Sequence, residues 1–305
     1  MAAATSPGAG RRYGIERVCR AWGVARSSLY AWRRRARGEA VPTPSARRRR
    51  GPAPTVSDEA LLAAIRADLA RSPWTGEGHR KVWARLRVLD GIRIARRRVL
   101  RVMREHGLLS PHRRPPRPAE AHDRRITTEA PNLMWGTDAT QITTVEDGRV
   151  WLFAVVEHWN AEALGWHVAE RGGRFAAAQA LGMAVKGVFG SLCAGTARGV
   201  AVRHDHGSAF MAEHFRNQAR FWGMAPSYAF VAEPETNGVA ERFFRTLLKE
   251  QVVHGRIYRT LEEVRAAVRA FVDRYNASWL IEKNGLMSPL DARTAWERGL
   301  MKAAA

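Results

Sequence analysis

Residues 133–170 read LMWGTDATQITTVEDGRVWLFAVVEHWNAEALGWHVAE, and their pattern decides the fold of the second half of the chain. The first run, 133–144, is rich in strand-forming residues, and the Asp-Gly pair at 147–148 that follows it is a strong hairpin signal. Two more apolar runs come at short intervals, at 149–159 and 163–170. We therefore predict three strands joined as an antiparallel meander.

Helices and strands alternate after this meander. The apolar spacing predicts helices at 174–189, 208–223 and 237–252, and strands at 199–205 and 225–231. A meander followed by alternating helices and strands implies a mixed sheet with helices on its faces. The predicted fold class is α/β, with a mixed five-stranded sheet flanked by helices in residues 129–255.

Three acidic residues occupy informative positions in this pattern. Asp138 lies in the first strand, Asp205 lies at the carboxyl end of the fourth strand, and Glu241 lies in the first turns of the last helix. Grouped carboxylates repel one another without a cation, and their hard oxygen ligands suit Mg²⁺ or Mn²⁺. Two such ions can activate a hydroxyl and stabilise the leaving oxygen of a phosphodiester. Taken singly, each acid could instead cap a turn, close a loop or face solvent.

A different metal site is suggested by residues 203–210, RHDHGSAF, because imidazole and carboxylate together also ligate zinc or iron. Side chains of consecutive strand residues alternate between the two faces, so three in a row rarely aim at one ion. We therefore favour Asp205 alone as the ligand. We expect Gly207 to let the chain turn away from the strand end. As a hypothesis, His204 and His206 could contact phosphate or tune a bound water.

The charge of the chain is concentrated in its first part. The net charge is +21, and residues 1–125 hold 30 Lys and Arg against 10 Asp and Glu, while residues 126–305 hold 20 against 19. A charge that served solubility alone would be spread evenly. A polyanionic partner for the first part is therefore expected, and nucleic acid is the default candidate.

Residues 1–40 predict a first DNA-binding unit. The segment RVCRAWGVARSSLYAWRRR gives a short helix, a turn at Gly23 and a second helix, which is the order of a helix-turn-helix. The residues expected to reach phosphates and base edges are Arg26, Ser27, Ser28, Arg33 and Arg34. A plain helical hairpin with a solvated basic face is the alternative. Residues 41–57 form a linker rich in Pro and Arg.

Residues 58–110 predict a second helix-turn-helix unit with three helices. The basic residues of its last helix that we expect to contact DNA are Arg96, Arg97, Arg98 and Arg101. A second linker rich in Pro and Arg, residues 111–128, joins this unit to the predicted sheet, and its prolines block helix formation. Residues 256–305 are expected to form a helical tail.

Three segments carry a resemblance to a known family: PNLMWGTDAT, RHDHGSAF and TNGVAERFFRTLLKE. They resemble the DDE transposases of the retroviral integrase superfamily, whose catalytic core is RNase H-like, and look most like the OrfB transposases of IS-three type bacterial insertion sequences. The 35 residues between Asp205 and Glu241 match the spacing of part of this superfamily. The two basic units and the tail resemble the corresponding parts of these transposases.

The resemblance implies roles for individual residues. Asp138, Asp205 and Glu241 would be the metal-binding catalytic triad, with Mg²⁺ or Mn²⁺ as cofactor and two ions as the expected number. Asn237 matches a position where the family usually has Asn, and Arg245 and Lys249 share a helical face with Glu241 and would contact DNA. The two histidines around Asp205 depart from the family pattern.

The implied function is binding of insertion-sequence ends, followed by DNA cleavage and strand transfer. The implied partners are double-stranded DNA at the transposon ends and the target, further copies of the chain, and the product of a small upstream reading frame. The alternatives are a catalytically inactive DNA-binding protein that retains the fold, and an RNase H-type nuclease that acts on RNA–DNA hybrids. With only two Cys and no apolar run long enough to span a membrane, we expect a cytoplasmic protein.

Overall fold

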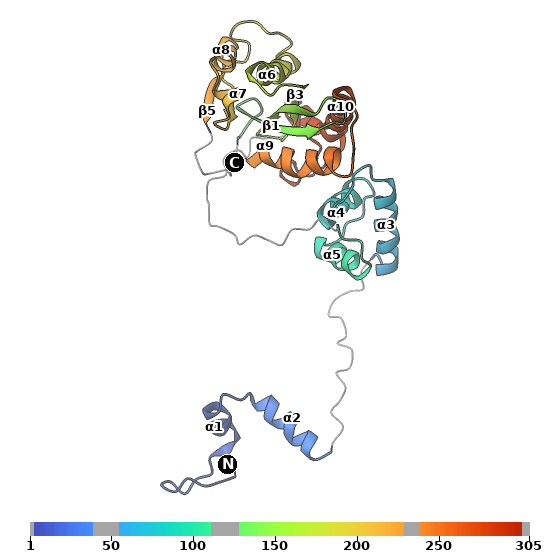
Figure 1. The fold of residues 1–305 in the computed structure, drawn as a ribbon. Helices are drawn as coiled ribbons and strands as arrows, with labels where there is room; N and C mark the ends of the chain where they lie inside the picture. Colours follow the sequence, from blue (N-terminus) through green and yellow to red (C-terminus); the bar gives the residue numbers. More distant parts are fainter. Residues whose placement is uncertain (1–2, 39–54, 111–127, 229–237, 301–305) are drawn as a thin grey trace. The chain divides into compact units, whose positions relative to one another are not determined.

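The structure is a computed structural model that describes residues 3–38, 55–110, 128–228 and 238–300, apart from the side chains of 245–249. The chain divides into two compact units, residues 1–55 and 56–305, and each unit is described by itself. Figure 1 colours the chain along its sequence. No described helix is long and apolar enough to cross a membrane.

The first unit contains two helices separated by a glycine turn. α1 (Gly14–Ala21) and α2 (Arg26–Ala36) lie on either side of Gly23, whose φ of 63° is a conformation that glycine adopts without strain. The predicted order of helix, turn and helix is therefore present. Within residues 3–38, Cys19 is the one buried residue.

Three helices at the start of the second unit surround their own hydrophobic core. They are α3 (Asp58–Arg71), α4 (His79–Val88) and α5 (Arg96–Glu105), as predicted. Their buried core residues are Leu61, Ile65, Val82, Leu86, Val99, Val102 and Met103. The Ser57 hydroxyl accepts a hydrogen bond from the Ala60 N–H and so caps the start of α3.

A mixed five-stranded sheet forms the centre of the second unit. Its strands are β1 (Met134–Thr143), β2 (Arg149–Glu157), β3 (Ala163–Ala169), β4 (Ala201–His204) and β5 (Ala225–Tyr228), in the order β3-β2-β1-β4-β5. The first three strands pair antiparallel as the predicted meander, and β4 and β5 add in parallel beyond β1. The predicted fold class is confirmed, and β1 is the central strand.

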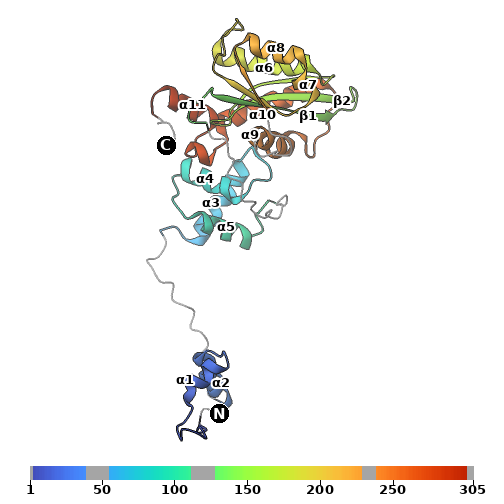
Figure 2. The same cartoon turned by 90° about the vertical axis from the view of Figure 1, so that its left-hand side faces the viewer.

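Helices cover both faces of the sheet (Figures 1 and 2). On one face lie α6 (Arg174–Phe189), α7 (Ser208–Met211) and α8 (Glu213–Phe221), which share a core cluster with β1, β2 and β4. On the other face lie α9 (Gly238–Arg242), the π-helix η2 (Phe243–Val253) and α10 (Leu261–Ser278), which pack against β2 and β3. The side of the sheet that a residue faces therefore decides which helices it meets.

Two predicted helices differ from the structure. The helix expected at 208–223 is broken at Ala212, whose extended ψ of 142° separates α7 from α8. The α-helix expected at 237–252 becomes a π-helix after Arg242. An apolar spacing near 3.6 residues does not distinguish helical hydrogen bonds to i+4 from those to i+5, so the pattern could not predict the change.

Residues of the predicted tail pack on the sheet. Buried side chains of α10 belong to the same core cluster as β2, and the Asn276 amide both donates to and accepts from the Ala163 backbone on β3. After α10 follow the short 3₁₀-helix η3 (Glu282–Asn284) and α11 (Pro289–Glu297). The amide of Asn284 donates to the Asn160 carbonyl in the turn between β2 and β3. The segment is therefore tied to the sheet by buried hydrogen bonds.

Candidate active site

Asp138 lies in the central strand and faces the layer of α9, η2 and α10. Its partner across the antiparallel pair is Ala154, a buried residue of the cluster that contains Phe243 and Phe244. Residues directly opposite in such a pair point to the same face of the sheet. The Asp138 side chain is half-buried, and its Oδ1 accepts a hydrogen bond from the Ala139 N–H at 2.8 Å.

Asp205 follows β4 immediately and stands level with Asp138. The last register pair between the parallel strands β1 and β4 joins Gly136 to Arg203. Asp138 lies two residues after Gly136, and Asp205 lies two residues after Arg203. The two aspartates are therefore at the same level along the strand direction. Asp205 is exposed, as expected for a residue just beyond a strand end. This is the carboxyl edge where parallel sheets usually place ligands.

Gly207 is required beside Asp205 for a reason other than the predicted one. Its φ of −58° is accessible to any residue, so a left-handed turn is not what demands glycine. A Cβ at this position would instead lie 2.8 Å from Asp205 Oδ1, which is too close for an ordinary contact. The Gly207 N–H donates to this Oδ1 at 2.9 Å. The glycine thus lets the backbone hold the carboxylate.

Glu241 reaches the same face of the sheet from a helix. α9 packs against β1 and β2, and the buried neighbours Ala240, Phe243 and Phe244 anchor it there. The Glu241 side chain is half-buried. Its carboxylate therefore belongs to the layer that Asp138 faces.

The structure brings the three elements together but does not gather the three carboxylates around one point. Within the described residues, no group of three or more His, Cys, Asp and Glu side chains could hold a metal ion. The shared elements are the central strand, the adjacent strand end and a helix on the face of Asp138. The triad of Asp138, Asp205 and Glu241 stays a prediction.

The two histidines around Asp205 have different environments. His204 is buried on the opposite face, where its ring lies 5.6 Å from the Phe210 ring and 5.7 Å from the Phe215 ring. Burial lowers the pKa of His204, although the hydrogen bond to the Asp205 carbonyl opposes this shift. The exposed His206 stacks on Tyr228 at 5.9 Å. His204 is thus a packed core ring on the face that Asp138 does not use.

Arg203 is a buried charge that the sequence reasoning did not single out. It is 4% exposed, and its paired neighbours on either side are Gly136 and Ser227. Nη1 donates to the Ser227 hydroxyl at 3.3 Å, while Nε and Nη2 have no hydrogen-bond partner among the described residues. Burial lowers the pKa of this guanidinium. An arginine inside the apolar run GVAVRHD was the signal that could have revealed it.

Two other basic side chains lie near Arg203: His158, which is buried, and Lys283, whose residue is exposed. Burial, followed by the charges of Lys283 and Arg203, lowers the pKa of His158 to about 4, so His158 is neutral at neutral pH. Burial also lowers the pKa of Lys283 to about 8, although the charge of Glu157 opposes the shift. The Lys283 ammonium donates to the His158 carbonyl at 2.8 Å. Arg203 and His158 are therefore buried near Lys283, and His158 carries no charge at neutral pH.

The predicted DNA-binding residues of α2 are mostly exposed. Arg26, Ser27, Arg33 and Arg34 are exposed and Ser28 is half-buried. Arg26 lies 3.8 Å from the Glu16 carboxylate in an exposed ion pair, which is worth little. Their contact with DNA stays a prediction.

Most of the predicted DNA-binding arginines of α5 are engaged within the protein. Arg98 and Arg101 both bind Asp58 at 2.7 Å, and Arg101 also binds Glu105 at 3.0 Å. Arg96 pairs with Glu282 at 3.0 Å, whereas Arg97 is exposed. Ion pairs to Asp58 hold the start of α3 against α5, so part of the basic surface also stabilises the unit.

Three further predicted residues cannot be placed. Asn237 and the side chains of Arg245 and Lys249 lie outside the described residues.

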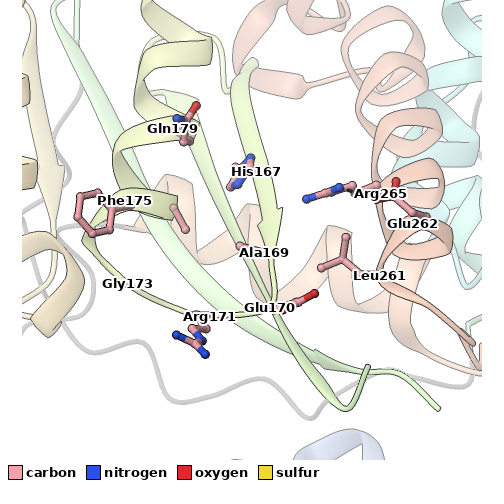
Figure 3. Close-up of a pocket in the computed structure, with 11 residues that line it drawn as sticks. His167, Ala169, Glu170, Arg171, Gly173, Phe175, Gln179, Leu261, Glu262 and Arg265 are labelled. Carbon is pink, nitrogen blue, oxygen red and sulfur yellow. Dashed lines mark hydrogen bonds and ion pairs between the residues drawn. The ribbon is translucent and has the colours of Figure 1, made fainter. Parts of the chain in front are cut away.

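A cavity with a volume of about 470 Å³ opens elsewhere, between β3, the start of α6 and the start of α10. Figure 3 shows His167, Gln179 and Arg265 among the side chains around it. None of the three predicted carboxylates lines this cavity. The candidate active site is therefore the edge of the sheet at the end of β4.

Two family models match this chain. Residues 57–116 match the HTH-like domain, and residues 222–278 match the integrase core domain. The first match coincides with the three-helix unit around α3, α4 and α5. The second contains Glu241 and continues into α10, beyond the predicted core boundary at residue 255.

Curated relatives are insertion-element transposases. Transposase InsD for insertion element IS2A/D/F/H/I/K of Escherichia coli is 31% identical over 182 residues, which cover 57% of this chain and 60% of that protein. Transposase InsD for insertion element IS2-9 of Escherichia coli strain K12 is also 31% identical over 182 residues, covering 57% of this chain and 58% of that protein. The chain thus spans about 60% of the length of the curated relatives that it matches.

Solved structures with some likeness are retroviral integrase cores. The catalytic core domain of BIV integrase has a TM-score of 0.41 and 17% identity, covering 55% of this chain and 97% of that one. The HTLV-2 integrase catalytic core domain in complex with magnesium has a TM-score of 0.39 and 14% identity, covering 53% of this chain and 97% of that one.

Proposed function

We propose that this chain, which is similar to insertion-element transposases and matches the HTH-like and integrase core domains, binds insertion-sequence ends and catalyses metal-dependent DNA cleavage and strand transfer. The observation that carries the proposal is the placement of its acids. Asp138 and Asp205 stand level on neighbouring parallel strands, and Glu241 comes from a helix packed on the same strand as Asp138. In the proposal, these three carboxylates hold the divalent ions together.

The donor set suits a hard divalent cation. Asp138, Asp205 and Glu241 offer only carboxylate oxygens, which Mg²⁺ and Mn²⁺ prefer. His204 is turned to the other face, so its imidazole, which would favour zinc or iron, is absent from the set. When bound, two ions would lower the pKa of the attacking hydroxyl and neutralise charge on the scissile phosphate. The Gly207 N–H keeps Asp205 oriented for this role.

The proposed reaction has two steps of the same kind. In cleavage, a water oxygen attacks phosphorus at the transposon end, the bond from phosphorus to the 3′ oxygen breaks, and a free 3′-OH results. In strand transfer this 3′-OH attacks a target phosphodiester, a new bond to phosphorus forms, and the target 3′ oxygen leaves with a proton. The carboxylates hold the reacting groups in line, and no covalent bond to the protein is formed.

The basic segments supply the DNA contacts in this proposal. α2 presents Arg33 to solvent, and α5 presents Arg97, both suited to phosphates and base edges. Two ends must be processed for one insertion, so a homo-oligomer on DNA is expected. The product of a small upstream reading frame is a further proposed partner.

Strand transfer in vitro tests the proposal. Full-length protein is mixed with duplex oligonucleotides that carry the ends of the element, a supercoiled target and Mg²⁺ or Mn²⁺. We expect joined products with the natural protein, and unchanged end binding without joining for Asp205→Asn. Equal joining by both proteins would remove Asp205 from the mechanism. End binding without cleavage by the natural protein would instead identify a DNA-binding protein that retains the fold without catalysis.

His206→Asn tests the remaining histidine hypothesis. If His206 tunes a bound water or the choice of ion, the ratio of Mg²⁺-supported to Mn²⁺-supported joining should change by severalfold. An unchanged ratio would leave the exposed ring as a neighbour of Tyr228 alone.

A further inference from the structure

One side chain of the loop between α3 and α4 is buried in the core of the sheet domain. Trp74 in this loop is 8% exposed and belongs to the cluster that contains β2 and α10. Its ring meets Trp279 edge-on at 4.8 Å and Phe271 at 6.2 Å. A buried tryptophan is among the largest apolar contributions that one side chain makes to a core. The three-helix unit is therefore fastened to the sheet domain by a core residue.

Polar contacts surround this tryptophan. The Thr75 N–H donates to the Gln251 side-chain oxygen at 3.1 Å, and the Gln251 amide donates to the Thr75 carbonyl at 2.8 Å. The Arg274 guanidinium donates to the Pro73 carbonyl at 3.3 Å and lies 5.5 Å from the Trp74 ring. Such reciprocal backbone contacts fix orientation as well as distance.

One residue of α4 adds a second anchor. The Lys81 ammonium lies 3.7 Å above the Trp279 ring and donates to the Leu280 carbonyl. A protonated amine over the face of a tryptophan ring is attracted to it electrostatically. We name this set the docking seam: Trp74, Thr75, Lys81, Gln251, Arg274 and Trp279.

The docking seam reaches the helix that carries Glu241. Gln251 lies in η2, which directly continues α9. On the other side of the seam, Lys81 lies in α4, and α4 packs on α5. A continuous path of packed and hydrogen-bonded residues thus joins the predicted recognition helix to the helix of a predicted catalytic acid.

We propose that Trp74 is a positioning residue that locks the second helix-turn-helix unit onto the catalytic core, so that the DNA sequence read by α5 lies at a fixed distance from the bond that is cleaved. This inference rests on the proposed function. In this proposal the three-helix unit is held rigidly on the catalytic core and acts as a ruler that fixes the distance from the recognised sequence to the cleaved bond. A DNA-binding domain tethered by a flexible linker could not fix that distance. Misplacement of reacting groups by about 1 Å costs on the order of 100-fold in rate, so such a lock has catalytic consequences.

Mapping the cleaved bond on end-labelled duplexes tests the inference with full-length protein. The natural protein should cut at one bond, and inserting one base pair between the recognised sequence and that bond should reduce cutting. For Trp74→Ala we expect end affinity within about threefold, cleavage reduced by at least about tenfold and cuts spread over several neighbouring bonds. Trp74→Phe, which keeps an aromatic ring, should restore the single cut. Cutting by Trp74→Ala at the natural bond and rate would overturn the inference.

Two further variants keep the test decisive. Trp296→Ala makes the same substitution at a half-buried tryptophan that meets Trp159 edge-on outside the docking seam, and its cut should stay at one bond. If Trp74→Ala loses end binding through unfolding, Gln251→Ala replaces it, since this change removes only the hydrogen bonds to Thr75. Spread cuts by Gln251→Ala support the ruler, and a single unchanged cut by Gln251→Ala overturns it.

Docking itself can be measured without cleavage. In hydrogen exchange, Trp74→Ala should speed exchange of residues 72–82 and leave β1 unchanged. If the natural protein cleaves no DNA, the proposed function fails while this measurement still decides whether the unit is locked. Equal exchange of residues 72–82 in both proteins would show that Trp74 does not lock it.

Discussion

The two predicted helix-turn-helix units differ in how they are built, although their sequences carry the same signature. In residues 3–38, Cys19 is the one buried residue, and Trp22, Tyr30 and Trp32 are 66%, 52% and 54% exposed. In the unit of α3, α4 and α5, seven apolar side chains are fully enclosed, and a buried ion pair lies beside them. The signature of helix, turn and helix predicts chain topology in both cases but says nothing of core size.

The difference extends to the arginines. Those of α2 are exposed, and those of α5 are largely held by Asp58, Glu105 and Glu282. An arginine that already has a carboxylate partner loses that pair when it binds phosphate. The first unit therefore leaves most of these arginines exposed, whereas the second unit uses most of its own to stabilise the fold.

The largest expected effect comes from the buried ion pair of the second unit. Arg85 binds Asp68 at 2.7 Å and Glu77 at 2.5 Å, with all three side chains less than 10% exposed. Arg85→Ala removes the close cation from two buried carboxylates, leaving Asp68 only Arg71 at 3.9 Å, and should cost about 3–5 kcal/mol of unfolding free energy. Urea unfolding of the full-length protein, followed by circular dichroism, measures this.

Arg87→Ala is the control for that variant, since Arg87 lies on the exposed side of the same helix. Its unfolding midpoint should stay within experimental error. If both variants were equally stable, the network would contribute nothing to the second unit, and the contrast between the units would rest on apolar packing alone.

The next effect compares one leucine in each unit. Leu86 is fully buried, so Leu86→Ala should cost about 2–5 kcal/mol. Leu29 of α2 is only half-buried, and Leu29→Ala should cost less than about 1 kcal/mol. Thermal unfolding by calorimetry gives both values. Similar losses at the two positions would mean that the first unit has a core as specific as that of the second.

The sequence predicted the sheet well because its strands are marked by alternation and by a turn signal. All five strands lie where the apolar runs and the Asp-Gly pair at 147–148 predicted them, and the order of strands and helices along the chain is as predicted. It could not predict the break at Ala212 or the π-helix after Arg242, which depend on tertiary packing. The sequence reasoning also missed Arg203, because a single buried arginine does not change the periodicity of the apolar residues around it.

The sequence predicted which three residues form the candidate site, and the structure adds where in the fold each of them lies. Register shows that Asp138 and Asp205 are level, which no residue count from the sequence could have established. The face of the sheet on which His204 packs could not be predicted either, because the aromatic rings that contact it come from α7 and α8. Long-range pairing decides such facts, and sequence periodicity is local.

A smaller effect is expected on DNA affinity. Arg33→Ala in α2 should make the slope of log affinity against log salt shallower by about 0.9, the value for one lost phosphate contact. Arg98→Ala should leave this slope unchanged, since Arg98 already binds Asp58, and should lower stability instead. Fluorescence anisotropy at several salt concentrations separates the two. A slope change for Arg98→Ala alone would reverse the roles assigned to the two units.

The smallest effect is the pH dependence of the Asp58 cluster. Hydrogen bonds from Arg101 and then Arg98 lower the pKa of Asp58 from 3.8 to about 2. Because the pKa is lower in the folded state, the unfolded chain binds more protons between these values, so the stabilisation is complete above pH 3.8 and is lost as pH falls towards 2. The urea midpoint of the natural protein should therefore approach that of Asp58→Asn over this range. Because these side chains are only half-buried, 1 M salt should shrink the difference. A constant gap between the two proteins from pH 5 to pH 2 would mean that Asp58 holds α3 to α5 by packing rather than by its charge.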